Sequence, residues 1–86
     1  MGMKESITTK LNNAFSPDYL EVIDESDQHA GHGGWREGQT THVRIRLRSA
    51  AFSGKNRVSI HREINQLLAD ELAAGLHALA IEAKAS

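Results

Sequence analysis

The feature that most constrains the fold is a strict alternation of apolar and basic residues from Val43 to Arg48. Successive side chains of a strand point to opposite faces, so this alternation predicts a strand over 41–49. Three apolar side chains would then lie on one face and three guanidinium groups on the other. We therefore expect a sheet whose apolar face packs on the rest of the chain and whose arginine face is open to solvent.

Two further elements are predicted before this strand. Apolar and small residues at helical spacing predict a helix over 5–15, which ends at Ser16-Pro17 because proline cannot continue the hydrogen-bond ladder. The β-branched and apolar run 19–24 predicts a strand. Consecutive strands usually neighbour one another, so strands 19–24 and 41–49 should pair antiparallel.

The remaining elements follow the strand. After a turn over 50–54 that includes a single helical turn, apolar residues at helical intervals predict the main helix over 57–73. Gly75 suits its C-terminal cap because glycine adopts the left-handed conformation without a Cβ penalty. The apolar run 76–83 predicts a third strand.

The predicted order is helix, two strands, helices, strand, which is an α+β fold of the type αββααβ. A strand, helix, strand connection within one sheet is nearly always right-handed, so the third strand should lie parallel to the second with the helices on one face. We expect one two-layer domain over 1–86, with its core at about 5–83. Eighty-six residues leave no room for a second domain.

Composition excludes several classes of protein. No apolar run approaches the ~18–20 residues of a transmembrane helix, and the charged first eleven residues lack the apolar centre of a signal peptide. The chain has no cysteine, so it can form neither disulfides nor thiolate ligands. We expect a cytoplasmic protein without a membrane partner, monomeric when isolated.

The net charge of −1 hides an uneven distribution of charge. Residues 41–62 carry six basic residues and no acidic one. Lys55, Arg57 and Arg62 would extend the positive surface of the predicted strand. One interpretation is a solvated sheet face with acidic residues from elsewhere opposite it, and the other is a nucleic-acid interface.

Histidines in a glycine-rich segment give the strongest functional signal. His29 and His32 lie within 27–38, and His77 lies near the start of the last apolar run. Imidazoles on such a loop, with another fixed at a strand, indicate a soft-metal site that one chain leaves incomplete. His42, which opens the second strand, is a candidate to support the site by packing or hydrogen bonding.

Two other residues have a less certain role. Trp35, the only tryptophan, is a candidate partner-binding residue or a cover for the metal, although it could equally shield the sheet edge. His61 lies on the core face of the main helix and is more simply a structural histidine.

An enzyme is not predicted. There is no cysteine nucleophile, no Gly-x-Ser-x-Gly turn and no phosphate-binding loop, and a glycine-rich loop would place zinc ligands badly for catalysis.

An ordered series of short motifs gives the chain a resemblance to a known family. The motifs are Leu-Glu-Val-Ile-Asp-Glu-Ser over 20–26, a loop histidine, Thr41-His42, Phe52-Ser-Gly54, His61-Arg62 with Leu67, Glu71-Leu72, and Leu-His-Ala-Leu-Ala-Ile over 76–81. In this order and spacing, over about 5–83, the chain resembles the BolA family. One departure is that the family usually has Arg-His-Arg where this chain has Ile60-His61-Arg62.

The resemblance implies a fold similar to the type II K-homology domain and a role as partner of monothiol glutaredoxins. In such complexes a [2Fe-2S] cluster is held by glutaredoxin and glutathione thiolates on one side and by BolA ligands on the other. The family ligands correspond to His29 in the loop and His77 near the C-terminus, with His32 as the alternative loop ligand. No cofactor is expected in the isolated chain. Ligation by a loop histidine, which the resemblance implies for this chain, fits a cluster that is held in place more than one that is rapidly passed on.

The resemblance also leaves a second function open, because the family has been regarded as transcriptional regulators. The corresponding nucleic-acid-binding residues would be Lys55, Arg57, His61 and Arg62. The K-homology Gly-x-x-Gly loop counts against RNA, since the segment before Lys55 supplies only one of its two glycines, Gly54. We therefore expect a non-enzymatic iron–sulfur adaptor that influences iron homeostasis or the stress response, with DNA-binding regulation as the alternative.

Overall fold

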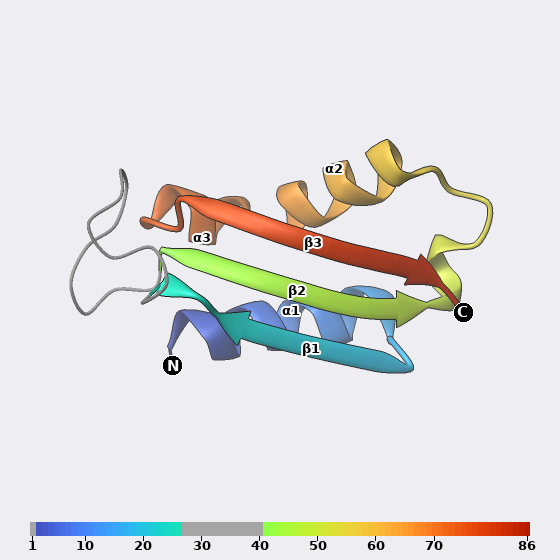
Figure 1. Cartoon of the computed structure of the whole chain (residues 1–86), viewed down its shortest axis with the longest axis horizontal. Helices are drawn as coiled ribbons and strands as arrows, with labels where there is room; N and C mark the ends of the chain where they lie inside the picture. The colour runs from blue at the N-terminus through green and yellow to red at the C-terminus, as the bar shows by residue number, and fades with distance from the viewer. Residues whose placement is uncertain (1, 27–40) are drawn as a thin grey trace.

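The computed structural model describes residues 2–26 and 41–86, which form the two-layer α+β domain predicted from the sequence (Figure 1). In chain order the elements are α1 (Met3–Phe15), β1 (Tyr19–Asp24), β2 (His42–Ser49), the 3-10 turn η2 (Ala50–Phe52), α2 (Arg57–Leu67), α3 (Ala69–Ala73) and β3 (Ala78–Ala85). The sheet order is β1-β2-β3, with β1 antiparallel and β3 parallel to β2. All three α-helices lie on one face of the sheet.

The core lies between the helices and the apolar face of β2. Val43, Ile45 and Leu47 are at most 2% exposed, as the alternation predicts. They are covered by apolar side chains of the helices and of the turn, namely Ile7, Leu11, Phe52, Ile60, Ile64 and Leu68. The central strand is thus buried on one face only, and its other face is available for charged groups.

The prediction of a single helix over 57–73 is wrong, because the helix is interrupted at Leu68, which lies between α2 and α3. Leu68 has φ −99° and ψ 19°, and its side chain is completely buried. After the break, Glu71 is the buried residue of α3, and its carboxylate accepts from Ser6 Oγ (2.6 Å) and from Lys10 Nζ (2.8 Å) of α1. The apolar periodicity runs across the break and therefore conceals it.

The third strand begins two residues later than predicted, at Ala78, and continues to Ala85. Leu76 is instead buried in the connection, where its N–H donates to the carbonyl of Glu71 (3.1 Å). Gly75 precedes it with φ 126°, a conformation that residues with a Cβ rarely adopt. His77 therefore lies just before the strand, where its direction is set by the turn. Among residues 2–26 and 41–86, no helix is long and apolar enough to cross a membrane.

Candidate metal centre and basic surfaces

Ser26 is the last described residue before segment 27–40 and Thr41 is the first after it, and these two residues are hydrogen-bonded to each other. The Ser26 hydroxyl oxygen accepts from the N–H of Thr41 (2.8 Å) and from the N–H of His42 (3.3 Å). Both Ser26 and Thr41 are buried. Segment 27–40 therefore starts and ends at one fixed point of the sheet.

His77 is held at the same point. Its backbone N–H donates to the carbonyl of Thr41 (2.8 Å), and the N–H of Ala78 donates to that same oxygen (3.1 Å). Two successive amides on one carbonyl fix the backbone, while the imidazole of His77 remains exposed. The position thus combines a rigid main chain with a side chain that a partner can reach.

His42 lies beside His77, with the ring centroids 5.5 Å apart and the ring planes inclined by 57°. In contrast to His77, the residue His42 is buried, and its Nδ1 lies 2.9 Å from the hydroxyl oxygen of Thr41. This contact fixes the orientation of the His42 ring against its neighbour. This geometry is compatible with the predicted supporting role of His42, and the role itself stays a prediction.

His29, His32 and Trp35 lie outside the described residues, so their predicted roles stay predictions. Within residues 2–26 and 41–86, no three histidine, cysteine, aspartate or glutamate side chains converge as a metal ion would require. Of the predicted site residues, the structure brings together His42 and His77.

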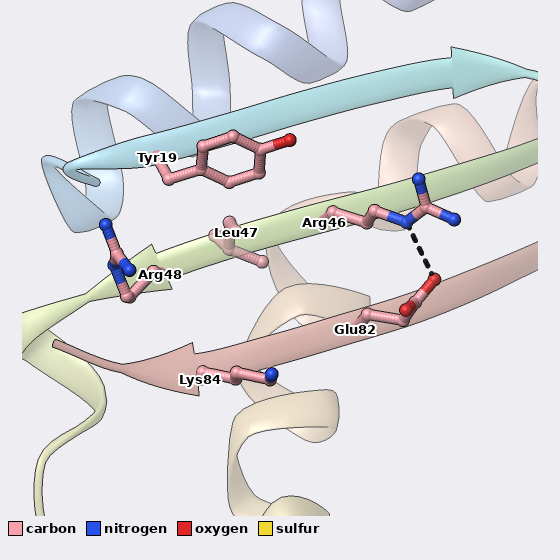
Figure 2. Close-up of a pocket in the computed structure, with 6 residues that line it drawn as sticks. All are labelled: Tyr19, Arg46, Leu47, Arg48, Glu82 and Lys84. Atoms are coloured by element: carbon pink, nitrogen blue, oxygen red, sulfur yellow. Dashed lines mark hydrogen bonds and ion pairs between the residues drawn. The ribbon is translucent and has the colours of Figure 1, made fainter.

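The three arginines of β2 lie on the outer face of the sheet, and each is paired with at least one carboxylate. Arg44 Nε lies 2.9 Å from Glu25 and its Nη1 2.9 Å from Glu82. Arg46 Nε lies 3.1 Å from Glu82, a contact drawn in Figure 2. Two further pairs complete this ion-pair ladder, Arg46 with Glu21 (3.3 Å) and Arg48 with Asp18 (3.0 Å).

The ladder changes the acidity of its members. Hydrogen bonds to Glu25 and Glu82 raise the pKa of Arg44, and hydrogen bonds to Glu82 and Glu21 raise the pKa of Arg46. Hydrogen bonds from these two arginines lower the pKa of Glu82. The structure therefore favours the interpretation of this face as a solvated surface with acidic residues opposite the arginines.

The cations that follow β2 are less uniformly paired. Lys55 Nζ lies 2.8 Å from both carboxylate oxygens of Glu63. Arg57 and Arg62 are exposed on α2, and neither forms an ion pair within the part of the chain that the structure describes. His61 is half-buried on the same helix. Of the predicted nucleic-acid-binding residues, Lys55 is thus neutralised by an acidic neighbour, whereas both arginines remain available.

Sequence reasoning missed the contacts that position His77. Ser26 and Thr41 appeared in the motifs of the family but without an assigned task, and no local pattern indicates that a serine hydroxyl joins the two ends of a segment. The acidic partners of the arginines, in contrast, could be predicted once the pairing of the strands was known. Once β1 and β2 pair antiparallel with Tyr19 opposite Arg48, alternation alone places Glu21 opposite Arg46.

The fold and the position of its histidines define a class of small α+β domain with a mixed three-stranded sheet, and comparisons with known proteins identify the family. A family model described as BolA-like protein matches residues 11–86. The chain therefore belongs to the BolA family.

Individual relatives agree with this assignment. A Sinorhizobium protein described as an uncharacterized protein in the cobS 5' region is 53% identical over 95% of this chain and 89% of its own length. The DNA-binding transcriptional regulator BolA of Vibrio cholerae is 42% identical over 92% of this chain and 71% of its own length. The solved BolA domain of SufE1 from Arabidopsis thaliana superposes with a TM-score of 0.87 at 46% identity, covering 99% of this chain and 94% of that one.

Proposed function

We propose that this chain is a non-enzymatic adaptor that pairs with a monothiol glutaredoxin and contributes two imidazole ligands to a shared [2Fe-2S] cluster. One observation carries the proposal. The exposed His77 is bonded through its backbone to Thr41, the residue at which the histidine-bearing segment 27–40 returns to the fold. Both ends of that segment therefore lie beside His77.

Chain length supports His29 as the second ligand. A chain advances at most about 3.6 Å per residue, so the Cα atom of His29 lies within about 11 Å of that of Ser26. His32 has a reach about twice as long and is the alternative ligand. Either imidazole can thus be brought to the end of the sheet at which His77 is exposed.

The donor set fits the proposed group. Imidazole nitrogens ligate [2Fe-2S] clusters in place of two thiolates, which removes negative charge and raises the reduction potential. The chain has no cysteine, so all thiolates would come from the partner and from glutathione. Histidine ligation from this chain would therefore retune the partner's cluster, a chemistry suited to signalling iron status or stress in the cytoplasm.

His42 and Trp35 have supporting tasks in this proposal. Groups around a ligating histidine help to orient its ring. The packing of the His42 ring, hydrogen-bonded to Thr41, against the His77 ring supports such a task for His42. Trp35 is proposed to contact the glutaredoxin, because large aromatic side chains concentrate binding energy at interfaces.

The proposal is tested by anaerobic reconstitution of the full chain with a monothiol glutaredoxin, glutathione, iron and sulfide. Visible absorption and circular dichroism are recorded for the parent and for H29A, H32A and H77A, with H61A as the matched control on α2. We expect altered spectra for H77A and for one loop variant, and a parent spectrum for H61A. Identical spectra for all variants would reject the ligand assignment.

A DNA-binding regulator is the second candidate, favoured by the two unpaired arginines of α2 and by the name of the Vibrio relative. Binding of duplex DNA by fluorescence anisotropy would then weaken steeply with salt, and the variant R57Q/R62Q would reduce the salt slope by about two. Pairing through a cluster would depend instead on iron, sulfide and glutathione. Affinity for DNA that is independent of both arginines would exclude α2 as the binding surface, and no measurable affinity for DNA would exclude this candidate.

A further inference from the structure

The outer edge of β3 is an eight-residue strand edge that no other strand covers in the described part of the chain. β3 is the last strand in the order β1-β2-β3 and pairs only with β2. A row of unpaired N–H and C=O groups of this kind is a template for another extended chain. Half of its side chains are small, with alanine at 78, 80, 83 and 85, and it contains no proline or glycine.

The direction of the β3 amides follows from the hydrogen bonds at the two ends of the strand. Ala78 N–H donates to Thr41 O (3.1 Å) and Ser86 N–H donates to Ser49 O (3.2 Å), so both point toward β2. Amides alternate between the two edges of a strand. Those pointing to the outer edge are therefore the amides of the odd-numbered residues Leu79, Ile81, Ala83 and Ala85.

At this edge α2 runs beside β3 (Figure 1), and a groove is lined by residues of both elements. Its cavity of about 170 Å³ is lined on one side by Arg57 and His61, which lie four residues apart on one face of α2. Its other side is formed by the four successive residues 81–84. These four residues belong to β3, the last strand in the sheet order, so the groove lies between that strand and α2.

The groove has an excess of positive charge. Arg57 and Lys84 are exposed, and neither forms an ion pair with any residue in 2–26 or 41–86. Glu82, the acidic residue of the groove, is turned to the outer face, where it pairs with Arg44 and Arg46. Figure 2 shows Lys84 near the end of β3, two residues after Glu82 on the same strand. The charge of the groove therefore complements an acidic ligand.

We propose that the edge of β3 binds an extended acidic segment of a partner protein as a fourth strand. The partner's main chain would pair with the outward amides and carbonyls of β3, as in other cases of strand addition. Its acidic side chains, which alternate with apolar ones and therefore share one face of the added strand, would lie on the helix side against Arg57 and His61, while Lys84 adds long-range attraction from the outer face. The proposal rests on residues remote from the proposed cluster ligands and is independent of the cluster.

A peptide fits this groove better than single-stranded nucleic acid. A strand edge alternates hydrogen-bond donors and acceptors, as an extended peptide does, whereas a phosphate backbone supplies acceptors alone. Nucleic-acid grooves of low sequence preference also use aromatic rings on which bases stack. No phenylalanine, tyrosine or tryptophan of the described residues lines this groove, since Phe52 is buried in the core, in contact with Phe15, and Tyr19 lies on β1 at the opposite edge of the sheet.

The test uses the full chain and an eight-residue peptide of alternating glutamate and valine, followed by amide NMR and hydrogen exchange. We expect the peptide to protect the outward amides of Leu79, Ile81, Ala83 and Ala85 from exchange more than the intervening ones. Backbone N-methylation of alternate peptide residues should abolish binding. Equal binding of the N-methylated peptide would overturn the proposal, because charge alone would then account for the affinity.

Charge variants complete the test. R57E/K84E should weaken binding of the glutamate peptide at least tenfold and should favour the matched peptide with lysine in place of glutamate. R62E, on the same helix but outside the groove, is the control and should bind as the parent does. Peptide contacts elsewhere on the molecule, or tighter binding of oligothymidylate than of the peptide with shifts at 81–84, would contradict the proposal.

Discussion

The outer face of the sheet and the end of the sheet at His77 differ in whether their basic side chains contact carboxylates. On the outer face, Arg44, Arg46 and Arg48 each contact at least one carboxylate, so the densest basic stretch of the sequence is neutralised by its own fold. At the other site, His77 is exposed, and within the described residues its ring contacts the neighbouring His42 ring and no carboxylate. A crowded charge pattern therefore identifies a stable surface, whereas an exposed and unpaired side chain on a fixed backbone identifies a candidate site.

The largest effect is expected at the histidine end, from S26A. This substitution leaves the buried N–H groups of Thr41 and His42 without the hydroxyl that accepts from both. Unsatisfied buried donors cost 1–3 kcal/mol each, so we expect a loss of about 2 kcal/mol in the free energy of unfolding, measured with urea. S53A, at an exposed serine, is the control and should change little. A loss below about 0.5 kcal/mol would show that Ser26 does not hold this end together.

A smaller effect is expected on the outer face, where acid should weaken the ion-pair ladder. The pKa of Glu82 is lowered below its usual 4.5 in the folded chain. A lowered folded pKa gives stability that is present above the unfolded pKa and is lost as pH falls through the folded one. Urea unfolding from pH 6 to pH 3 should therefore show a shallower acid loss for E82Q than for the parent. Parallel curves would mean that Glu82 gains nothing from its arginines.

The double variant E21Q/E82Q should have the smallest effect on stability. It should, however, make the outer face resemble the histidine end most directly, because it leaves basic side chains without carboxylate partners. Arg46 then loses both of its carboxylate partners and Arg44 loses one. We expect the double variant to elute from heparin at higher salt than the parent, because unpaired guanidinium groups bind polyanions. The control is E63Q on α2, which frees Lys55, a residue that precedes this helix, instead. Unchanged elution of E21Q/E82Q would indicate that the outer face was open to anions in the parent as well.

Periodicity predicted much of this fold because the residues that decide it are close in sequence. The alternation over Val43–Arg48 has one physical solution, a half-buried strand, and it places both the core and the arginines. The break at Leu68 could not be predicted in this way. The contacts of α3 beyond the break are made by Glu71 with Ser6 and Lys10, sixty or more residues away in sequence, which local periodicity does not register.

The ligand roles of the candidate site stay predictions, and the geometry that the structure describes around His77 was not predicted. The sequence indicated that His77 and a loop histidine belong together, from residue type and from the resemblance to a family. It gave no sign that Thr41 would accept from the amides of both His77 and Ala78, because a backbone carbonyl has no signature in the sequence. The fixed position of His77 is a property of the backbone, which the sequence specifies only through the whole fold.

The most direct measurement of the central claim is pulsed electron paramagnetic resonance on the reduced complex of this chain with a monothiol glutaredoxin. The chain is prepared once with natural nitrogen and once with ¹⁵N-histidine, while the glutaredoxin and glutathione stay unlabelled. Ligation by His77 and a loop imidazole predicts strong nitrogen couplings that change with the isotope and that are reduced in H77A. Couplings that do not respond to labelling of this chain would contradict the claim that its imidazoles ligate the cluster.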